Sequence, residues 1–359
     1  MVKKRKKTCQ IHVGPVCIGG AAPVSVQSMT KTDTRNARAT LAQIRRLEKA
    51  GCEIIRVAVP DEAAAASLPA IVKNSRIPVI ADIHFHHRLA LKAIAAGVAG
   101  LRLNPGNIGS RQKIAAVLEQ ARDRGISIRI GVNSGSLEKD IRKQYGGPTP
   151  EALVESALRS IELFEHRAFT SIKVSIKSPD VVTTVDAYRL LSRKTRYPLH
   201  IGITEAGTLF SGTIKSAVGL GILLSEGIGD TLRVSLSADP VEEVRAGFAI
   251  LNALGIRQHG PEIISCPTCG RCQIDVISLA RTIEAKLSSM KLPVKIAVMG
   301  CEVNGPGEAR EADIGIAGSR SKGVLFKRGV IIRRCDKSDL LEEFYRELAT
   351  LTEDKKTEE

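Results

Sequence analysis

The feature that most constrains the fold is an alternation of short apolar runs, rich in Val and Ile, with longer segments of helical pattern. Eight runs have the length and composition of buried strands, at residues 24–27, 54–57, 79–82, 100–103, 128–131, 172–176, 199–203 and 231–234. Helical periodicity occurs at residues 37–51, 88–97, 111–125, 150–166, 181–195, 216–226 and 240–254. Such alternation predicts parallel βα units. Eight units favour a closed (β/α)8 TIM-type barrel over an open sheet, so the predicted class is α/β.

The alternation ends near residues 255–262, and a smaller unit of mixed pattern follows. This unit contains a helical segment near residues 275–291 and strand-like runs near 294–299, 314–317, 324–326 and 330–333. A final helical segment covers residues 338–352. A chain of 359 residues is long enough for two domains. We therefore expect a barrel domain at residues 1–258 and a small α+β domain at residues 259–359.

The net charge of +15 indicates that the chain binds an acidic partner. A basic chain can bind nucleic acid, or it can hold a polyanionic small molecule and dock to an acidic protein. Aromatic residues make up only 3% of the chain and Trp is absent, which argues against base stacking and hence against nucleic acid. Part of the charge lies in residues 3–7, which we interpret as a solvated end.

Cysteine usage and hydropathy indicate the compartment. Four of the eight cysteines fall within residues 266–301, a distribution unlike the disulfide framework of a small secreted domain. No apolar run reaches the length of about 18 residues that a membrane span needs. The basic start is not followed by the apolar segment of a secretory signal. We expect a cytoplasmic protein with no membrane partner.

Polar and charged side chains gather where the predicted strands end, which is the face of a (β/α)8 barrel that carries catalysis. Several pairs stand two residues apart, so both members share one face of an extended strand. Cations that converge on one mouth repel one another, and an anion with several oxygens relieves that repulsion because Arg forks match phosphate. The set comprises Arg56, Asp82, Arg102, Asn104, Arg129, Asn133, Ser175, Lys177, Glu205, Arg233 and Ser235.

The alternative interpretation is ordinary surface charge at loop starts. It explains any single residue, but it explains less well why most strand ends carry a charge. Asp82 and Glu205 can each donate a proton or anchor a hydroxyl group, and spacing does not assign the two roles. His84, His86 and His87 follow Asp82, and we interpret them as a packed or hydrogen-bonded loop in preference to a metal site.

A Cys-x-x-Cys pair, Cys266 and Cys269, together with the distant Cys301, predicts a thiolate-ligated centre in the second domain. A structural zinc site would use these thiolates and a fourth one such as Cys272. A [4Fe–4S] cluster would use the same three and a further ligand. A carboxylate ligand such as Glu308 would leave one iron reactive. A thioredoxin-like redox pair fits less well, because the cysteines do not open a helix within a βαβ unit.

Seven short motifs together resemble the family of 4-hydroxy-3-methylbut-2-en-1-yl diphosphate synthases, which serve the methylerythritol phosphate route to isoprenoids. The resemblance runs in order from about residue 8 to about residue 345 and matches the shorter, two-domain bacterial form. The motifs are QSMT at residues 27–30, ADIHF at 81–85, LNPGN at 103–107, GVNSG at 131–135, GITEAG at 202–207, SCPTCGR at 265–271 and MGCEVNGPGE at 299–308.

This resemblance implies a (β/α)8 barrel joined to a small iron–sulfur domain. It implies that 2-C-methyl-D-erythritol 2,4-cyclodiphosphate is reduced by two electrons, with ring opening and loss of water, to 4-hydroxy-3-methylbut-2-enyl diphosphate. Flavodoxin or ferredoxin would supply the electrons. The implied assembly is a homodimer in which the cluster domain of one subunit covers the barrel mouth of the other.

The resemblance also implies residue roles. Cys266, Cys269 and Cys301 would be thiolate ligands of a [4Fe–4S] cluster, Glu308 its carboxylate ligand, and Asn304 a neighbour of the open iron. Glu205 is the favoured proton donor, and with Asp82 and Asn133 it would contact the substrate. The implied diphosphate-binding residues are Arg56, Arg102, Arg129, Lys177, Arg233 and Ser235, and we add Asn104 at its strand end.

Two positions leave alternatives open. Cys272 is not a cysteine in the family's motif, so a fourth thiolate ligand competes with Glu308. Lys173 lies four residues before Lys177, so either lysine can be the one that contacts the diphosphate. The alternative function is a zinc-stapled barrel enzyme that acts on a phosphorylated or pterin-type substrate without redox chemistry.

Overall fold

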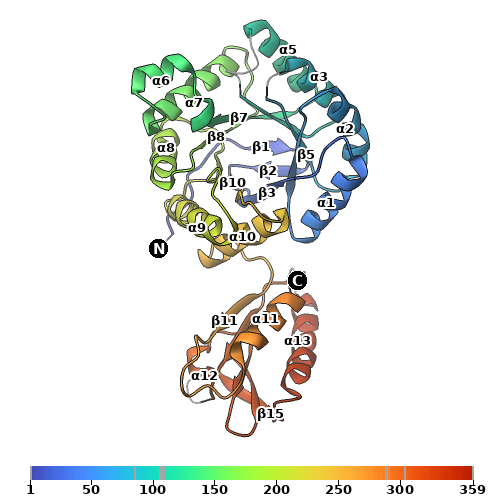
Figure 1. Ribbon diagram of the computed structural model, residues 1–359, viewed down its shortest axis with the longest axis vertical. Helices are drawn as coiled ribbons and strands as arrows, with labels where there is room; N and C mark the ends of the chain where they lie inside the picture. The colour runs from blue at the N-terminus through green and yellow to red at the C-terminus, as the bar shows by residue number, and fades with distance from the viewer. Residues whose placement is uncertain are drawn as a thin grey trace. The chain divides into compact units, whose positions relative to one another are not determined.

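The computed structural model describes residues 2–84, 86–104, 110–287, 290, 292–302 and 305–357. The chain divides into two compact units, Met1–Arg257 and Gln258–Glu359. Figure 1 shows a ring of helices around strands in the first unit and a single sheet with helices in the second. Each unit is described by itself.

The first unit is a parallel barrel. Its strands are β3 (Ser25–Met29), β4 (Ile54–Ala58), β5 (Val79–Asp82), β6 (Gly100–Leu103), β7 (Ser127–Asn133), β8 (Ile172–Lys177), β9 (His200–Ile201) and β10 (Thr231–Leu232). They are ordered β8-β7-β6-β5-β4-β3-β10-β9. A parallel bridge from Val174 to Leu199 joins the two ends of this order and closes the ring. All eight strands lie where the sequence predicts them, and the predicted fold class is confirmed.

Helices cover the outside of the barrel (Figure 1). They are α1 (Ala37–Lys49), α2 (Glu62–Asn74), α3 (His87–Ala95), α5 (Arg111–Asp123), α6 (Lys139–Tyr145), α7 (Pro150–Glu165), α8 (Val181–Lys194), α9 (Leu209–Ser225) and α10 (Pro240–Ala253). Helices α2 and α6 were not predicted from the sequence, and α9 begins earlier than residue 216, where the sequence predicted it. In α2, Pro69 is a helix breaker by local preference, yet the burial of Leu68 and Ile71 on either side stabilises the helix.

The inner faces of the strands are polar, unlike the branched aliphatic filling usual for this fold. On β8, Ile172, Val174 and Ile176 belong to the hydrophobic core shared with the helices. Because side chains alternate along a strand, Lys173 and Lys177 lie on the opposite face, inside the barrel. Both lysines are nevertheless buried. The strand pattern therefore sends cations into the barrel and its C-terminal mouth.

A hairpin and the chain start cover the N-terminal end of the barrel. Strands β1 (Ile11–Val13) and β2 (Val16–Ile18) pair antiparallel, and their apolar residues pack against Ile54 and Ile80. The backbone N–H of Lys6 donates to the Gly227 carbonyl at 2.9 Å, and the Arg5 guanidinium donates to the Gly20 carbonyl at 3.0 Å. The expectation of a free, solvated end was therefore wrong for these two residues.

The second unit is an α+β domain. Its sheet has the order β11 (Glu262–Ser265), β12 (Lys295–Met299), β13 (Ile314–Gly318), β14 (Gly323–Lys327) and β15 (Val330–Cys335). The first three strands are parallel and the last three antiparallel. Helices α11 (Val276–Leu287) and α13 (Leu340–Thr357) share a hydrophobic core with one face of the sheet. The short helix α12 (Gly305–Glu308) is followed by Ala309 and Ala312, which pack against the other face.

Within the described part of the chain, the helices are all too short or too polar to cross a membrane.

Candidate active site

The mouth of the barrel gathers most of the polar residues that the sequence singled out. Asp82, Asn133 and Lys177 are the last residues of β5, β7 and β8, whereas Asn104, Arg233 and Ser235 follow β6 and β10. Arg56, Arg102 and Arg129 stand within β4, β6 and β7. Burial is high, since Arg56, Arg102, Arg129 and Lys177 are between 3% and 9% exposed. Four buried basic side chains in one mouth are an arrangement that would attract an anion strongly.

Asp82 is the carboxylate around which the arginines are arranged. Its Oδ1 lies 3.3 Å from Nη1 of Arg102, and its Oδ2 lies 3.6 Å from Nε of Arg56. His84 closes the arrangement, with Nε2 at 3.3 Å from Nη1 of Arg102 and 3.7 Å from Asp82 Oδ2. The interpretation of His84 as part of a hydrogen-bonded loop agrees with these contacts.

The charges in the mouth shift one another's protonation. Burial lowers the pKa of Arg56 to about 10, although Asp82 opposes that change. Burial also lowers the pKa of Lys177 well below its ordinary value, and Arg129 and Arg233 lower it further. Burial alone would raise the pKa of Asp82, but Arg56, His84 and Arg102 outweigh it, and the net pKa lies well below the usual range. Asp82 is therefore ionised at neutral pH and suits the role of an anchor better than that of a proton donor.

Glu243 was missed by sequence reasoning. It lies in α10, is 1% exposed, and accepts hydrogen bonds from Ser28 Oγ at 3.1 Å and from the Leu236 backbone at 3.1 Å. Its carboxylate also receives Arg233 Nε at 3.3 Å and lies 3.3 Å from Lys31 Nζ. Glu243 thus holds Arg233 toward the mouth. Glu243 stands in the first turn of α10, where acidic residues are common. The local sequence therefore did not mark it as a site residue.

Two glycines make room for the long cations. An added Cβ at Gly202 would lie 2.4 Å from Nζ of Lys177, and one at Gly131 would lie 2.7 Å from Nε of Arg102. Neither position can carry a side chain without displacing the cationic group of Lys177 or Arg102. These glycines belong to the GITEAG and GVNSG motifs, so their role in the motif is steric.

The remaining polar residues line the rim. Asn104 Nδ2 donates to Ser136 Oγ at 3.2 Å, and Ser136 Oγ donates to the Asn133 carbonyl at 3.2 Å. Glu205 is exposed and has φ +51°, a left-handed conformation that is strained for a residue with a side chain. Such strain is concentrated at functional positions. Ser235 is half-buried.

Two cysteines of the second unit, Cys266 and Cys301, lie at the carboxyl edge of its parallel strands. Cys266 directly follows β11, and its N–H donates to the Val298 carbonyl of β12 at 3.0 Å. Cys301 follows β12, and its carbonyl accepts from Gly305 N–H at the start of α12, whose last residue is Glu308. The thiols of Cys266, Cys269 and Cys301 are free. Three free thiols, two of them on this edge, are a donor set that suits a thiolate-bound iron–sulfur cluster.

The described residues do not gather this set into a preformed centre. Among them, no group of three or more His, Cys, Asp and Glu side chains lies close enough to hold a metal ion. Asn304, expected beside the open iron, lies outside the described residues. The ligand assignment therefore stays a prediction.

Cys272 differs from the other three cysteines. Its Sγ donates to the Ile274 carbonyl at 3.1 Å, and an added Cβ at Gly300 would lie 2.8 Å from it. It also packs against the hydrophobic core of the second unit. A thiol so engaged behaves as a small apolar side chain, which supports its interpretation as an incidental thiol.

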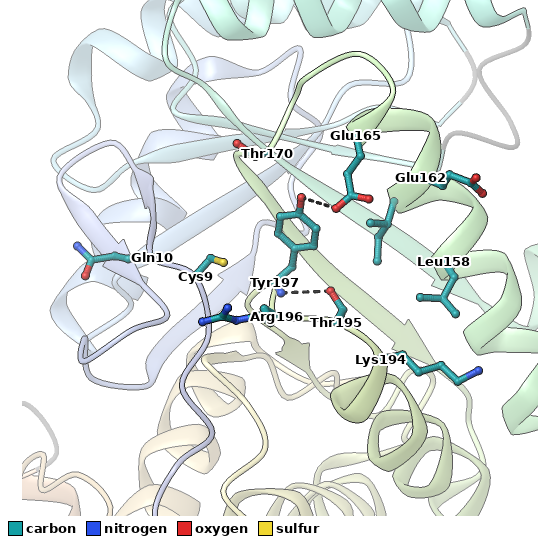
Figure 2. Close-up of a pocket in the computed structure, with 11 residues that line it drawn as sticks. Cys9, Gln10, Leu158, Glu162, Glu165, Thr170, Lys194, Thr195, Arg196 and Tyr197 are labelled. Atoms are coloured by element: carbon teal, nitrogen blue, oxygen red, sulfur yellow. Dashed lines mark hydrogen bonds between the residues drawn. The ribbon is translucent and has the colours of Figure 1, made fainter.

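A separate pocket of ~620 Å³ lies at the other end of the barrel, near the starts of β8 and β9 (Figure 2). Tyr197 stands in it and donates its hydroxyl to Glu165 at 2.9 Å, as the dashed line in Figure 2 marks. Cys9, Lys194 and Arg196 also line it. None of the predicted site residues is among its lining residues.

Known proteins match the chain over nearly its whole length. Residues 8–248 match the family model of the GcpE TIM-barrel domain, and residues 262–350 match that of the GcpE protein C-terminal domain. Two similar proteins are both named 4-hydroxy-3-methylbut-2-en-1-yl diphosphate synthase (flavodoxin). The one from Geobacter sulfurreducens is 59% identical over 98% of this chain and 99% of its own length. The one from Lawsonia intracellularis is 60% identical over 94% of each.

Solved structures also resemble the first unit. The dihydropteroate synthase of Stenotrophomonas maltophilia has a TM-score of 0.50 at 13% identity and covers 68% of this chain and 98% of its own. At that identity the likeness shows the barrel fold alone.

Proposed function

Because the chain belongs to the GcpE family, we propose that it reduces 2-C-methyl-D-erythritol 2,4-cyclodiphosphate to 4-hydroxy-3-methylbut-2-enyl diphosphate. The observation that carries this proposal is the near full-length identity to proteins named as synthases of that diphosphate. The alternative of a zinc-stapled enzyme without redox chemistry finds no support among these relatives. The likeness to a pteroate enzyme is confined to the fold.

The barrel mouth is proposed as the site for the cyclic diphosphate. Phosphate oxygens match the forked donors of arginine, and the mouth offers buried guanidinium groups at Arg56, Arg102 and Arg129. Lys177 and Arg233 add charge, and Asn104, Asn133 and Ser235 add neutral hydrogen-bonding groups. The fold has already buried these cations before an anion arrives. They bind an anion more strongly than surface lysines would, because water screens their charge less.

In the second unit, Cys266, Cys269 and Cys301 are proposed as thiolate ligands and Glu308 as the carboxylate ligand of a [4Fe–4S] cluster. When bound, such a cluster would supply single electrons and a Lewis-acidic iron. All eight cysteine thiols of the chain are free. Free thiols that must bind iron need a reducing compartment, so we also propose the cytoplasm.

The chain's own residues would then orient the substrate and move protons. The reaction takes up two electrons, breaks a ring C–O bond and releases one oxygen as water, which requires a proton donor. Glu205 is proposed as that donor, because it is an exposed carboxyl group at the rim. Asp82, held ionised between Arg56 and Arg102, would hold the two guanidinium groups in place. It would also accept a hydrogen bond from a hydroxyl group of the substrate. Asn304 is proposed as a further polar contact.

The decisive experiment is anaerobic reconstitution with iron and sulfide, followed by assay with the cyclic diphosphate and a reductant. We expect a brown protein that forms the linear diphosphate. Cys301→Ser should lose iron and activity together, whereas Cys272→Ala should keep both. A colourless protein that binds zinc and holds no iron under any reconstitution would contradict the proposal.

Flavodoxin or ferredoxin is proposed as the electron donor, since the relatives are named for flavodoxin. Residues 258–359 contain 16 Lys and Arg and 16 Asp and Glu, so the net charge of +15 belongs to residues 1–257. An acidic carrier would therefore be steered mainly by the barrel unit. The turnover rate at limiting carrier should fall steeply with added salt, and a rate insensitive to salt would contradict this steering.

A homodimer is proposed as the assembly. Helix α9 exposes an apolar stripe in which Phe210, Ile214 and Val218 repeat every four residues and are 79%, 48% and 49% exposed. Such a stripe is typical of an interface. Phe210→Glu should convert the protein to a monomer in light scattering, and an unchanged dimer would exclude α9 from the interface.

A further inference from the structure

Beneath the mouth, inside the barrel, a lysine is buried without a partner. Lys173 of β8 is 1% exposed, and its Nζ has no hydrogen-bond partner among the described residues. It lies opposite Arg129 in the β7–β8 register. His200 of β9 is fully buried, and neither of its ring nitrogens has a hydrogen-bond partner among the residues that the structure describes. Orphaned polar atoms at such depth are uncommon in folded proteins and call for a physical reason.

The surroundings of Lys173 are cationic. Arg129 of β7 and Arg56 of β4 act on it directly. Lys177 lies on the same face of β8, Arg102 on β6, and His200 on β9. The buried acidic groups are Asp82 of β5 and Glu243 of α10, and Glu243 is paired with Arg233. Tyr188 of α8 approaches from outside the barrel and donates its hydroxyl to the His200 carbonyl at 2.6 Å. Two carboxylates do not neutralise this many cationic groups, which comprise Arg56, Arg102, Arg129, Arg233 and the two lysines.

The two kinds of cation respond differently to crowding. Arginine keeps its proton in proteins, whereas a buried lysine gives its proton up readily. Burial lowers the pKa of Lys173 well below its ordinary value, and Arg129 and Arg56 lower it further. The pKa of Lys177 is lowered in the same way, so without an anion in the mouth both lysines relieve the repulsion by staying neutral. Lys173 is the more deeply buried of the two, at 1% against 7% exposed.

We propose that Lys173 takes up a proton from solvent when a diphosphate enters the mouth, so that anion capture is coupled to proton uptake. The inference rests on the proposed function, because it requires an anionic ligand at the arginines. The step is an acid–base one, in which the amine lone pair accepts a proton and no other bond changes. Lys173 is in this sense a positioning residue that supplies charge from one layer below the ligand, whereas Lys177 is the last residue of the same strand.

Calorimetry can count the protons. The full chain, reconstituted but without reductant, is titrated with 2-C-methyl-D-erythritol 2,4-cyclodiphosphate at pH 8 in buffers of different ionisation enthalpy. Each phosphorus of this probe has one ester bond and one anhydride bond, so it keeps a single strongly acidic hydroxyl that does not titrate near pH 8, and any proton uptake belongs to the protein. We expect uptake in the wild type and a Kd that tightens up to about tenfold per pH unit for each coupled proton as pH falls. Lys173→Met should lower the proton count and flatten this dependence.

The control variant is Lys73→Met, on the exposed side of α2, which should match the wild type. Binding with a heat that is the same in every buffer would overturn the coupling and leave the anion site standing. A wild type that fails to bind the probe would overturn both the proposed function and the coupling. Equal proton counts in wild type and Lys173→Met would show that another group takes up the proton, and the assignment to Lys173 would fall.

Thermal unfolding provides a second measurement that does not depend on the ligand. The unfolded chain binds a proton at Lys173 more tightly than the folded chain, so this lysine destabilises the fold at low pH and ceases to do so as pH rises through the unfolded pKa. Lys173→Met should therefore raise the melting temperature, and more at pH 6 than at pH 9. A lower melting temperature at both pH values would mean that Lys173 has a stabilising partner, and it would overturn the inference.

Discussion

Gly131 provides the most direct test of how tightly the cationic mouth is built. A Cβ at this position would lie 2.7 Å from Nε of Arg102 and 3.4 Å from its Cζ. Ordinary contact between carbon and nitrogen needs about 3.4 Å, so the guanidinium would have to move by ~0.7 Å. Arg102 is 5% exposed and lies 3.3 Å from Asp82. It has little free space, and a shift would weaken its ion pair.

We expect Gly131→Ala to lower the free energy of unfolding by about 1–3 kcal/mol, the usual effect of overpacking. If Arg102 binds the substrate as proposed, displacing it by somewhat less than 1 Å should lower kcat/KM by roughly 10- to 100-fold. Anaerobic kinetics with the cyclic diphosphate and thermal melts measure the two effects.

The matched control is Gly221→Ala in α9, where nothing lies within 4 Å of the added Cβ. It should leave kcat/KM unchanged and stabilise the helix by up to about 1 kcal/mol. A Gly131→Ala protein with wild-type kcat/KM and melting temperature would refute the claim that this glycine makes room for Arg102.

Three further predictions concern Glu243, Asp82 and Cys272. Glu243→Gln removes the buried charge that faces Arg233 and should raise KM about tenfold and destabilise the fold by about 3–5 kcal/mol; unchanged steady-state kinetics would exclude a positioning role. Because the folded pKa of Asp82 is depressed, its stabilising contribution is present above the unfolded pKa and is lost as pH falls below about 4. In urea unfolding, the free energy of unfolding of Asp82→Asn should fall less than that of the wild type as pH drops below about 4. Parallel pH dependences of the two proteins would contradict this. Cys272→Ala should keep its iron content while losing about 1 kcal/mol of packing, and loss of iron would make Cys272 a ligand.

The sequence predicted the architecture well because the strands are short, apolar and regularly spaced. All eight barrel strands and the cationic strand ends were located from pattern alone. Helix α2 was missed because Pro69 argues locally against a helix, and the buried contacts that stabilise it are long-range. Strand β11 was missed because its four residues merge with the cysteine motif, and its pairing with β12 is visible only in three dimensions.

The site was predicted less completely than the fold. Spacing shows which side chains share a strand face, but not which carboxylate holds which arginine. The link from Glu243 to Arg233 joins a helix to a loop, and the link from His84 to Arg102 joins the loop after β5 to strand β6. The depth of Lys173 follows from the alternation on β8, but its lack of a partner depends on the side chains of neighbouring strands. The roles of Glu205 and the cysteine ligands remain predictions.

The hydrophilic lining of the barrel bears on attempts to engineer this protein. The first unit is stabilised by the hydrophobic core between the strands and the surrounding helices. The buried cations inside the barrel destabilise it. A laboratory search for heat-resistant variants should therefore enrich apolar substitutions at lumen positions such as Lys173 and His200. Such variants would be more stable but would bind their ligand less tightly. Screens on this scaffold therefore need to select for ligand affinity and thermal stability together.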